Sequence, residues 1–255
     1  MLPELQPTVR AIARQAGALL RHNFTRPQEI TLKGRHDPVT ASDLASQELI
    51  IQRLSQAFPD FGFLAEEAGA PDSGRQSDGL WIIDPLDGTV NFAHGFPMFA
   101  VSIAWQWQGV VTYGVVYDPM RDELFDALRG QGAWLNDQPL RVSPIDDLDR
   151  ALLATGFPYN VTQHLEATMR RFQNLVARAQ GVRRPGSAAL DLCYLAAGRV
   201  DGFWEEGLKP WDTAAAVLIV EEAGGRISTF SGAPFTLDSD TVAASNRLLH
   251  EQLLA

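Results

Sequence analysis

The hydrophobic pattern changes once along the 255-residue chain, near residue 147, and this change constrains the possible architectures most. Residues 99–142 form short apolar runs separated by turn residues, which is typical of an antiparallel meander. After a polar, acidic connection at 143–150, short apolar runs alternate with longer helical patterns. We therefore expect an α+β half over residues 1–147 and an α/β half over residues 148–255, joined in one compact unit.

Apolar residues spaced by three and four predict helices in both halves. One helix is expected over residues 9–24, and a second after Thr40, where Asp43 completes a capping-box pattern. Further helices are predicted over 164–180, 187–197 and 211–223, and from 246 onward, and a mobile loop over 70–79. The second helix should pack through Leu44, Ile51, Leu54 and Phe58. The helix over 164–180 should bury four apolar side chains, namely Leu165, Met169, Phe172 and Val176.

Composition excludes several classes of function. The net charge is −10, and the basic residues form no stripe, so we expect no direct nucleic-acid binding. No apolar run approaches the roughly 18 residues of a membrane span, so no membrane association is expected. A single cysteine, Cys193, and a polar, charged N-terminal segment favour the reducing cytoplasm. An acidic chain can act on an anionic substrate only where bound cations or backbone N–H groups reverse the local potential.

The most informative motif is Asp84-Pro85-Leu86-Asp87-Gly88-Thr89. A predicted strand leads into Asp84, and Asp87 follows three residues later, so both carboxylates can converge on one point. Gly88 would let the backbone approach a ligand closely, and the N–H groups after it could bind phosphate oxygens. Taken alone, the motif could also be a surface turn.

Three more carboxylates occupy the ends of predicted elements. Glu66 and Glu67 close the run 61–65, and Asp212 opens the helix over 211–223. Oxygen ligands without suitably spaced His or Cys favour a hard cation such as Mg²⁺ over zinc. Structural roles remain open alternatives: a solvated loop for Glu66 and Glu67, a helix cap for Asp212, and the capping box for Asp43.

In order and spacing, these blocks resemble the inositol monophosphatase family of Mg²⁺-dependent, lithium-sensitive phosphomonoesterases, in its bacterial branch. The segments that carry the resemblance are 66–67, 84–92 and 211–225, together with 117–125, 130–133 and 184–191. The resemblance implies a layered αβαβα sandwich of the type shared with fructose-1,6-bisphosphatase. It also implies a homodimer.

The resemblance implies a role for each matching residue. One Mg²⁺ would bind Glu66, Asp84 and the backbone carbonyl of Leu86, and a second would bind Asp84, Asp87 and Asp212. Glu66 would hold a weaker third ion, giving two to three ions per site. Thr89, hydrogen-bonded to Asp43, would orient the attacking water, and Glu66 would help to activate it.

The substrate would be a small phosphorylated polyol. The residues implied to contact it are Asp87, Gly88, Thr89, Gly186, Ser187, Ala188, Glu205 and Asp212. We expect hydrolysis of myo-inositol 1-phosphate, with fructose 1,6-bisphosphate, histidinol phosphate and 3′-phosphoadenosine 5′-phosphate as alternatives. A non-catalytic phosphate-binding partner protein is the alternative of another class. His94 and Cys193 are expected to be structural.

Overall fold

The computed structural model describes residues 2–26, 30–34, 37–67, 69 and 78–255. The loop predicted over 70–79 therefore lies almost wholly outside the described residues. Within the described ranges, none of the helices combines the length and the apolar character needed to cross a lipid bilayer.

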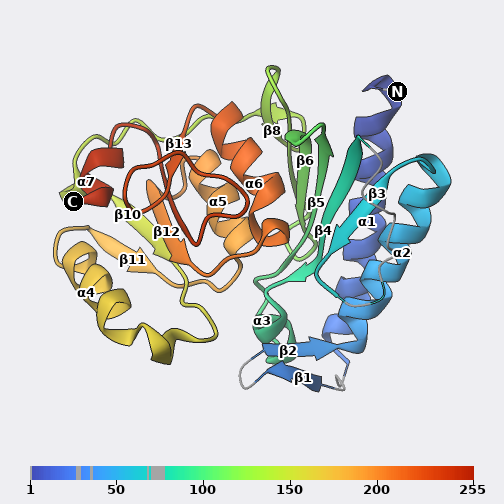
Figure 1. The fold of residues 1–255 in the computed structure, drawn as a ribbon, viewed down its shortest axis with the longest axis horizontal. Coiled ribbons are helices and arrows are strands. Elements are labelled where there is room, and N and C mark those ends of the chain that lie inside the picture. The colour runs from blue at the N-terminus through green and yellow to red at the C-terminus, as the bar shows by residue number, and fades with distance from the viewer. Residues whose placement is uncertain (1, 27–29, 35–36, 68, 70–77) are drawn as a thin grey trace.

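The chain folds into five layers, helix–sheet–helix–sheet–helix (Figure 1). Helices α1 (Leu2–Phe24) and α2 (Ala41–Ala57) cover the outer face of the first sheet. Helices α5 (Ala188–Ala196) and α6 (Pro210–Glu222) lie between the two sheets. Helices α4 (Leu165–Val176) and α7 (His250–Leu254) cover the outer face of the second sheet. This is the predicted αβαβα sandwich.

The first sheet has seven strands in the order β3-β4-β5-β6-β7-β8-β9. Its strands are β3 (Gly62–Ala65), β4 (Gly79–Asp87), β5 (Ala100–Trp107), β6 (Val110–Asp118), β7 (Glu123–Leu128), β8 (Gly132–Leu135) and β9 (Gln138–Pro139). The edge strand β3 pairs parallel with β4, and every later neighbour pairs antiparallel. The predicted meander is therefore present, extended at one edge by a parallel strand.

The second sheet has five strands in the order β11-β10-β12-β14-β13. Its strands are β10 (Leu152–Thr155), β11 (Gly181–Arg183), β12 (Gly202–Glu206), β13 (Arg226–Ser228) and β14 (Thr241–Ser245). The predicted boundary at 147 falls in the connection between the two sheets. The division into two distinct halves stays a prediction. Strands β11 and β13 have three residues each, too few for a periodic signal, and were not predicted.

Five small elements complete the described chain. Strands β1 (Ile30–Gly34) and β2 (Asp37–Thr40) form a separate antiparallel pair. Helix α3 (Thr89–Ala93) and the 3₁₀ turns η1 (Leu148–Arg150) and η2 (Val161–Gln163) are short connections. Helix α3 positions the residues that follow the Asp84–Asp87 motif.

Helix α6 occupies the centre of the molecule. Residues 213–220 are all buried, as expected for a helix that packs against a sheet on one side and a helix on the other. Strand β6 approaches it so closely that a Cβ on Gly114 would lie 2.8 Å from the backbone of Ala215. The tight contact joins the two halves next to the cavity described below.

One predicted helix face is wrong and another is right in part. Helix α4 is shorter than predicted, and three of its four expected inward residues are exposed: Leu165 (49%), Met169 (37%) and Val176 (44%). It is an outermost helix that buries Leu175 instead. On α2, Leu54 and Phe58 are buried and Ile51 packs against the same core, whereas Leu44 is 49% exposed. The buried side of α2 also includes four polar residues, which apolar spacing cannot predict: Ser42, Asp43, Ser46 and Gln47.

Candidate active site

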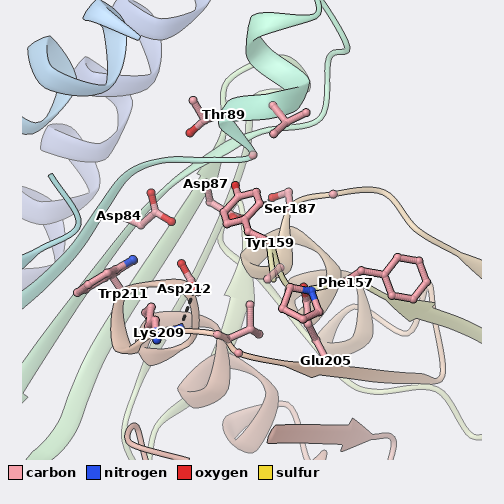
Figure 2. A pocket seen from close by; sticks show the side chains of 18 of the residues that line it. Asp84, Asp87, Thr89, Phe157, Tyr159, Ser187, Glu205, Lys209, Trp211 and Asp212 are labelled. Carbon is pink, nitrogen blue, oxygen red and sulfur yellow. Dashed lines mark hydrogen bonds between the residues drawn. The ribbon is translucent and has the colours of Figure 1, made fainter. Parts of the chain in front are cut away.

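A cavity of about 320 Å³ opens where the two halves meet (Figure 2). It is lined by every candidate site residue named above except Asp43 and the buried Glu67: Glu66, Asp84, Leu86, Asp87, Gly88, Thr89, Gly186, Ser187, Ala188, Glu205 and Asp212. Asp43 lies directly behind Thr89 and bonds to it. The structure therefore brings together residues separated by up to 169 positions in the chain.

Asp84 and Asp87 lie at the C-terminal end of strand β4, where its pairing with β5 is irregular. Asp84 pairs with Ser102 and Asp87 with Ala100, so three steps along β4 match two along β5. Such a bulge redirects the side chains on either side of it. The Asp84 carboxylate is held by the Leu86 N–H, which donates to Oδ1 at 3.0 Å.

Gly88 is required by the backbone conformation. Its φ is +96°, and a Cβ at this position would lie 2.9 Å from the carbonyl oxygen of Met98. Asn91, one turn later, donates from its amide to the carbonyls of Met98 (2.7 Å) and Pro185 (2.9 Å). This amide ties the segment around Gly186 in the second half to α3 in the first half.

Asp43 makes both contacts that the sequence left as alternatives. Its Oδ2 accepts from the Thr40 N–H (2.8 Å) and hydroxyl (2.6 Å), which forms the capping box of α2. Its Oδ1 accepts from the Thr89 hydroxyl at 2.9 Å. The Thr89 hydroxyl also lies 3.0 Å from the carbonyl oxygen of Leu86, so its single proton points away from the cavity.

Asp87 and Asp212 are likewise fixed by helix ends. Asp87 Oδ2 accepts from the Ser187 hydroxyl and from the Ala189 N–H (2.9 Å) at the start of α5. Asp212 Oδ2 accepts from the Lys209 N–H at 2.7 Å, at the start of α6. Asp212 therefore caps α6, which was its structural alternative, and the same carboxylate also lines the cavity.

The clustered carboxylates oppose one another's ionisation. Burial raises the pKa of Asp84 well above its usual range, and the charges of Glu66, Asp87 and Asp212 raise it further. Burial raises the pKa of Asp87 to about 6 and that of Asp212 to about 8. An added cation would remove this repulsion.

This donor set fits a hard cation. It consists of oxygens from carboxylates and a carbonyl, which suits Mg²⁺. In the described part of the chain, no three His, Cys, Asp or Glu side chains are placed to enclose an ion by themselves. A cation here would need the Leu86 carbonyl, water or substrate oxygens to complete its coordination, which suits the tendency of Mg²⁺ to retain waters.

Glu205 forms the opposite wall of the cavity. Burial raises its pKa to about 8, with a further contribution from the charge of Asp212. Gly156 gives this carboxylate its space, because a Cβ there would lie 2.1 Å from a Glu205 oxygen. Behind the wall, Asp191 is buried, and its Oδ1 has no hydrogen-bond partner among the described residues.

Several cavity residues escaped the sequence analysis because they lie on loops without a periodic pattern. These are Phe157, Tyr159, Arg184 and Lys209, while Trp211, in the first turn of α6, was predicted only as the start of a helix. Arg184 opens the 184–191 segment, which was a usable signal, whereas Gly156 and Asn91 act through partners distant in sequence. His94 is exposed and does not line the cavity. Cys193 is fully buried, and burial raises the pKa of its thiol, so it is an inert core residue.

Comparison with known proteins decides the family. The model of the inositol monophosphatase family matches residues 1–255. The chain belongs to the inositol monophosphatase family. An inositol-1-monophosphatase from Mesorhizobium japonicum is 45% identical, over 95% of this chain and 91% of that protein. A Nus factor SuhB from Pasteurella multocida is 47% identical, over 99% of this chain and 95% of that protein.

Solved structures of inositol monophosphatase relatives share the fold. The extragenic suppressor protein suhB from Bartonella henselae superposes with a TM-score of 0.94 at 41% identity, covering 98% of this chain and 97% of that one. The inositol monophosphatase from Anabaena superposes with a TM-score of 0.89 at 38% identity, covering 99% and 94%. Membership of the inositol monophosphatase family supports phosphatase activity, while the names of the relatives point to more than one role.

Proposed function

We propose that the chain is a Mg²⁺-dependent phosphomonoester hydrolase of the cytoplasm that releases phosphate from a small phosphorylated polyol, with myo-inositol 1-phosphate as the first candidate. The observation that carries the proposal is one cavity lined by Asp84, Asp87, Asp212, Glu66 and Thr89, in which the charges of the other three carboxylates raise the pKa of Asp84. An acidic protein gains affinity for a phosphate dianion only when cations occupy such a site.

Two groups of oxygen ligands would hold the cations. Glu66, Asp84 and the Leu86 carbonyl would contribute to one group. Asp84, Asp87 and Asp212 would contribute to the other together with water and substrate oxygens, and Glu66 would hold a weaker third ion. When bound, Mg²⁺ supplies positive charge that neutralises the phosphate and the leaving alkoxide and lowers the pKa of a water molecule. Ser187 and Lys209 support the proposal, because they hold Asp87 and Asp212 in place.

Thr89 is proposed to orient the nucleophilic water. Its hydroxyl proton is committed to Asp43 and the Leu86 carbonyl, so its oxygen lone pairs remain to accept a proton of that water. Glu66 lines the same cavity and would take up the proton. The Gly88 backbone leaves room for the phosphate oxygens.

Glu205 is proposed to bind the alcohol part of the substrate, with Gly186, Ser187 and Ala188 beside it. Its carboxyl oxygens line the cavity, where they can accept hydrogen bonds from the hydroxyls of a polyol. Ser187 contributes mainly structure, since its hydroxyl is bonded to Asp87.

The test is phosphate release from inositol 1-phosphate, fructose 1,6-bisphosphate, histidinol phosphate and 3′-phosphoadenosine 5′-phosphate, with and without Mg²⁺ and Li⁺. We expect Mg²⁺-dependent release, fastest from inositol 1-phosphate, inhibition by Li⁺, and a large loss in Asp87→Asn. A preference for another substrate would keep the mechanism and reassign the pocket around Glu205. Unchanged release by Asp87→Asn would refute the metal assignment.

A role as a partner protein is the second candidate, favoured by the relative from Pasteurella multocida named Nus factor SuhB. The two roles separate experimentally. In a bacterium lacking its own SuhB, Asp87→Asn should fail to restore growth if hydrolysis is the required activity. Full restoration by this variant would favour the partner role.

A further inference from the structure

The segment that carries Glu66 leaves the first sheet at its edge. Among the described strands, β3 is the outermost and pairs on one side with β4. The pairing continues one residue past the strand, where the Glu66 N–H donates to the Ile83 carbonyl at 3.1 Å. The chain bends at Glu66 and Glu67, and the N–H and C=O of Glu67 lie on the opposite side, towards α2.

On that opposite side, the side chain of Gln47 takes the place of a neighbouring strand. Its Nε2 donates to the Glu67 carbonyl at 2.9 Å, and its Oε1 accepts from the Glu67 N–H at 2.9 Å. Both residues are 4% exposed, so the two bonds are shielded from water. A primary amide is the side-chain group that offers a donor and an acceptor in this arrangement.

Gln47 is one of three polar residues through which α2 reaches the site. Residues 43, 46 and 47 share one face of the helix. Asp43 bonds to Thr89, the Ser46 hydroxyl donates to the Pro85 carbonyl at 2.8 Å, and Gln47 bonds to Glu67. Asp43 and Ser46 contact the 84–92 segment and Gln47 contacts the segment of Glu66, so all three support backbone that carries a proposed ligand or the water-orienting group. This explains why these buried positions of α2 are polar.

We propose that Gln47 is a positioning residue that sets the backbone of Glu66 and so controls how strongly the cations of the site bind. This inference rests on the proposed function. Hydrogen bonds on both sides hold the backbone around Glu66: its own N–H bonds to β4, and the N–H and C=O of Glu67 bond to Gln47. If the bonds to Gln47 are lost, the carboxylate of Glu66 must be ordered when the ion binds, at a cost in affinity.

The test compares Gln47→Met with Gln52→Met. Met keeps the length of the side chain and removes both hydrogen bonds, and Gln52 is exposed on the same helix. Mg²⁺ binding to the protein without substrate is measured by calorimetry, together with the Mg²⁺ dependence of phosphate release and urea unfolding. We expect Gln47→Met to raise the Mg²⁺ Kd about tenfold, or about 1.4 kcal/mol. KM at saturating Mg²⁺ should change less than twofold, and Gln52→Met should match the wild type.

A folded Gln47→Met protein with unchanged Mg²⁺ affinity would overturn the inference, because a merely structural role lowers stability alone. If Gln47→Met does not fold, Gln47→Glu retains an acceptor for the Glu67 N–H and should raise the Kd severalfold; an unchanged Kd would again refute the inference. Weakened Mg²⁺ binding in a chain whose wild type releases no phosphate would support the positioning role while refuting the proposed function.

Discussion

At the scale of single residues, Asp43 shows that a structural and a functional role need not compete. One oxygen caps α2 and the other holds Thr89. Asp43→Ala removes both contacts, whereas Thr40→Ala removes a hydroxyl from the cap and leaves the Thr89 contact. Loss of a helix cap costs about 1 kcal/mol.

We therefore expect both variants to be destabilised by about 1 kcal/mol in urea unfolding, with kcat reduced at least tenfold in Asp43→Ala alone. Turnover and stability are measured on the same preparations. Equal turnover in the two variants would assign Asp43 to the cap alone.

Asp191 should make stability depend on pH. Burial raises its pKa well above the usual range, with further contributions from the charges of Glu205 and Asp87. The unfolded chain releases this proton above about pH 4, while the folded chain retains it up to the raised pKa. The folded state then binds more protons, so its stability falls as the pH rises through this window.

Asn cannot ionise, so Asp191→Asn should gain stability relative to the wild type between pH 5 and pH 8. Urea unfolding in the presence of EDTA measures the difference at each pH. A stability difference that is the same at both pH values would contradict the assignment.

At the scale of elements, the junction of β6 with α6 depends on a missing side chain. A Cβ on Gly114 would overlap the backbone of Ala215, which cannot move without displacing the central helix. Overpacking of a core typically costs 1–3 kcal/mol, so Gly114→Ala should be destabilised by at least about 2 kcal/mol. Gly181→Ala on β11 is the control, because the nearest atoms there belong to side chains of Arg183 and Leu152. Equal chemical stability of the two variants would refute the tight contact.

The elements also show what sequence can and cannot predict. Helices α2 and α4 were predicted from apolar spacing, yet most of the α4 face was misassigned, and the α2 face was right except for Leu44 but missed the polar residues. On α2 the polar part of the buried side serves the site, and on α4 the apolar side remains exposed. Asp84 and Asp87 were found because a strand end followed by a turn is a local signal. The roles of Gln47, Asn91 and Asp191 depend on partners that only the fold brings near, so no local pattern could show them.

At the scale of the whole molecule, the site exists only where the halves meet. The first half contributes Glu66, Asp84 and Asp87, and the second contributes Asp212. A cation bound between them should stabilise the assembled fold, by about 2.7 kcal/mol at a concentration one hundred times its Kd. Thermal unfolding with Mg²⁺ and with EDTA should show a higher Tm with the ion, and Asp87→Asn should lose most of the shift. An equal shift in Asp87→Asn would place the stabilising ion elsewhere.

The exposed apolar residues of α4 suggest where a second copy binds. Leu165, Met169 and Val176 lie on an outermost helix, and large exposed apolar patches usually mark interaction sites. The resemblance to the family predicts a homodimer, so we expect a species of about twice the 28.0 kDa chain mass in sedimentation. Because a charge buried in an apolar interface is costly, Met169→Asp should shift the equilibrium to monomer. Leu248→Asp, an exposed leucine beyond α4, should remain dimeric. A dimeric Met169→Asp would place the interface elsewhere, and a monomeric wild type would show the homodimer prediction to be wrong.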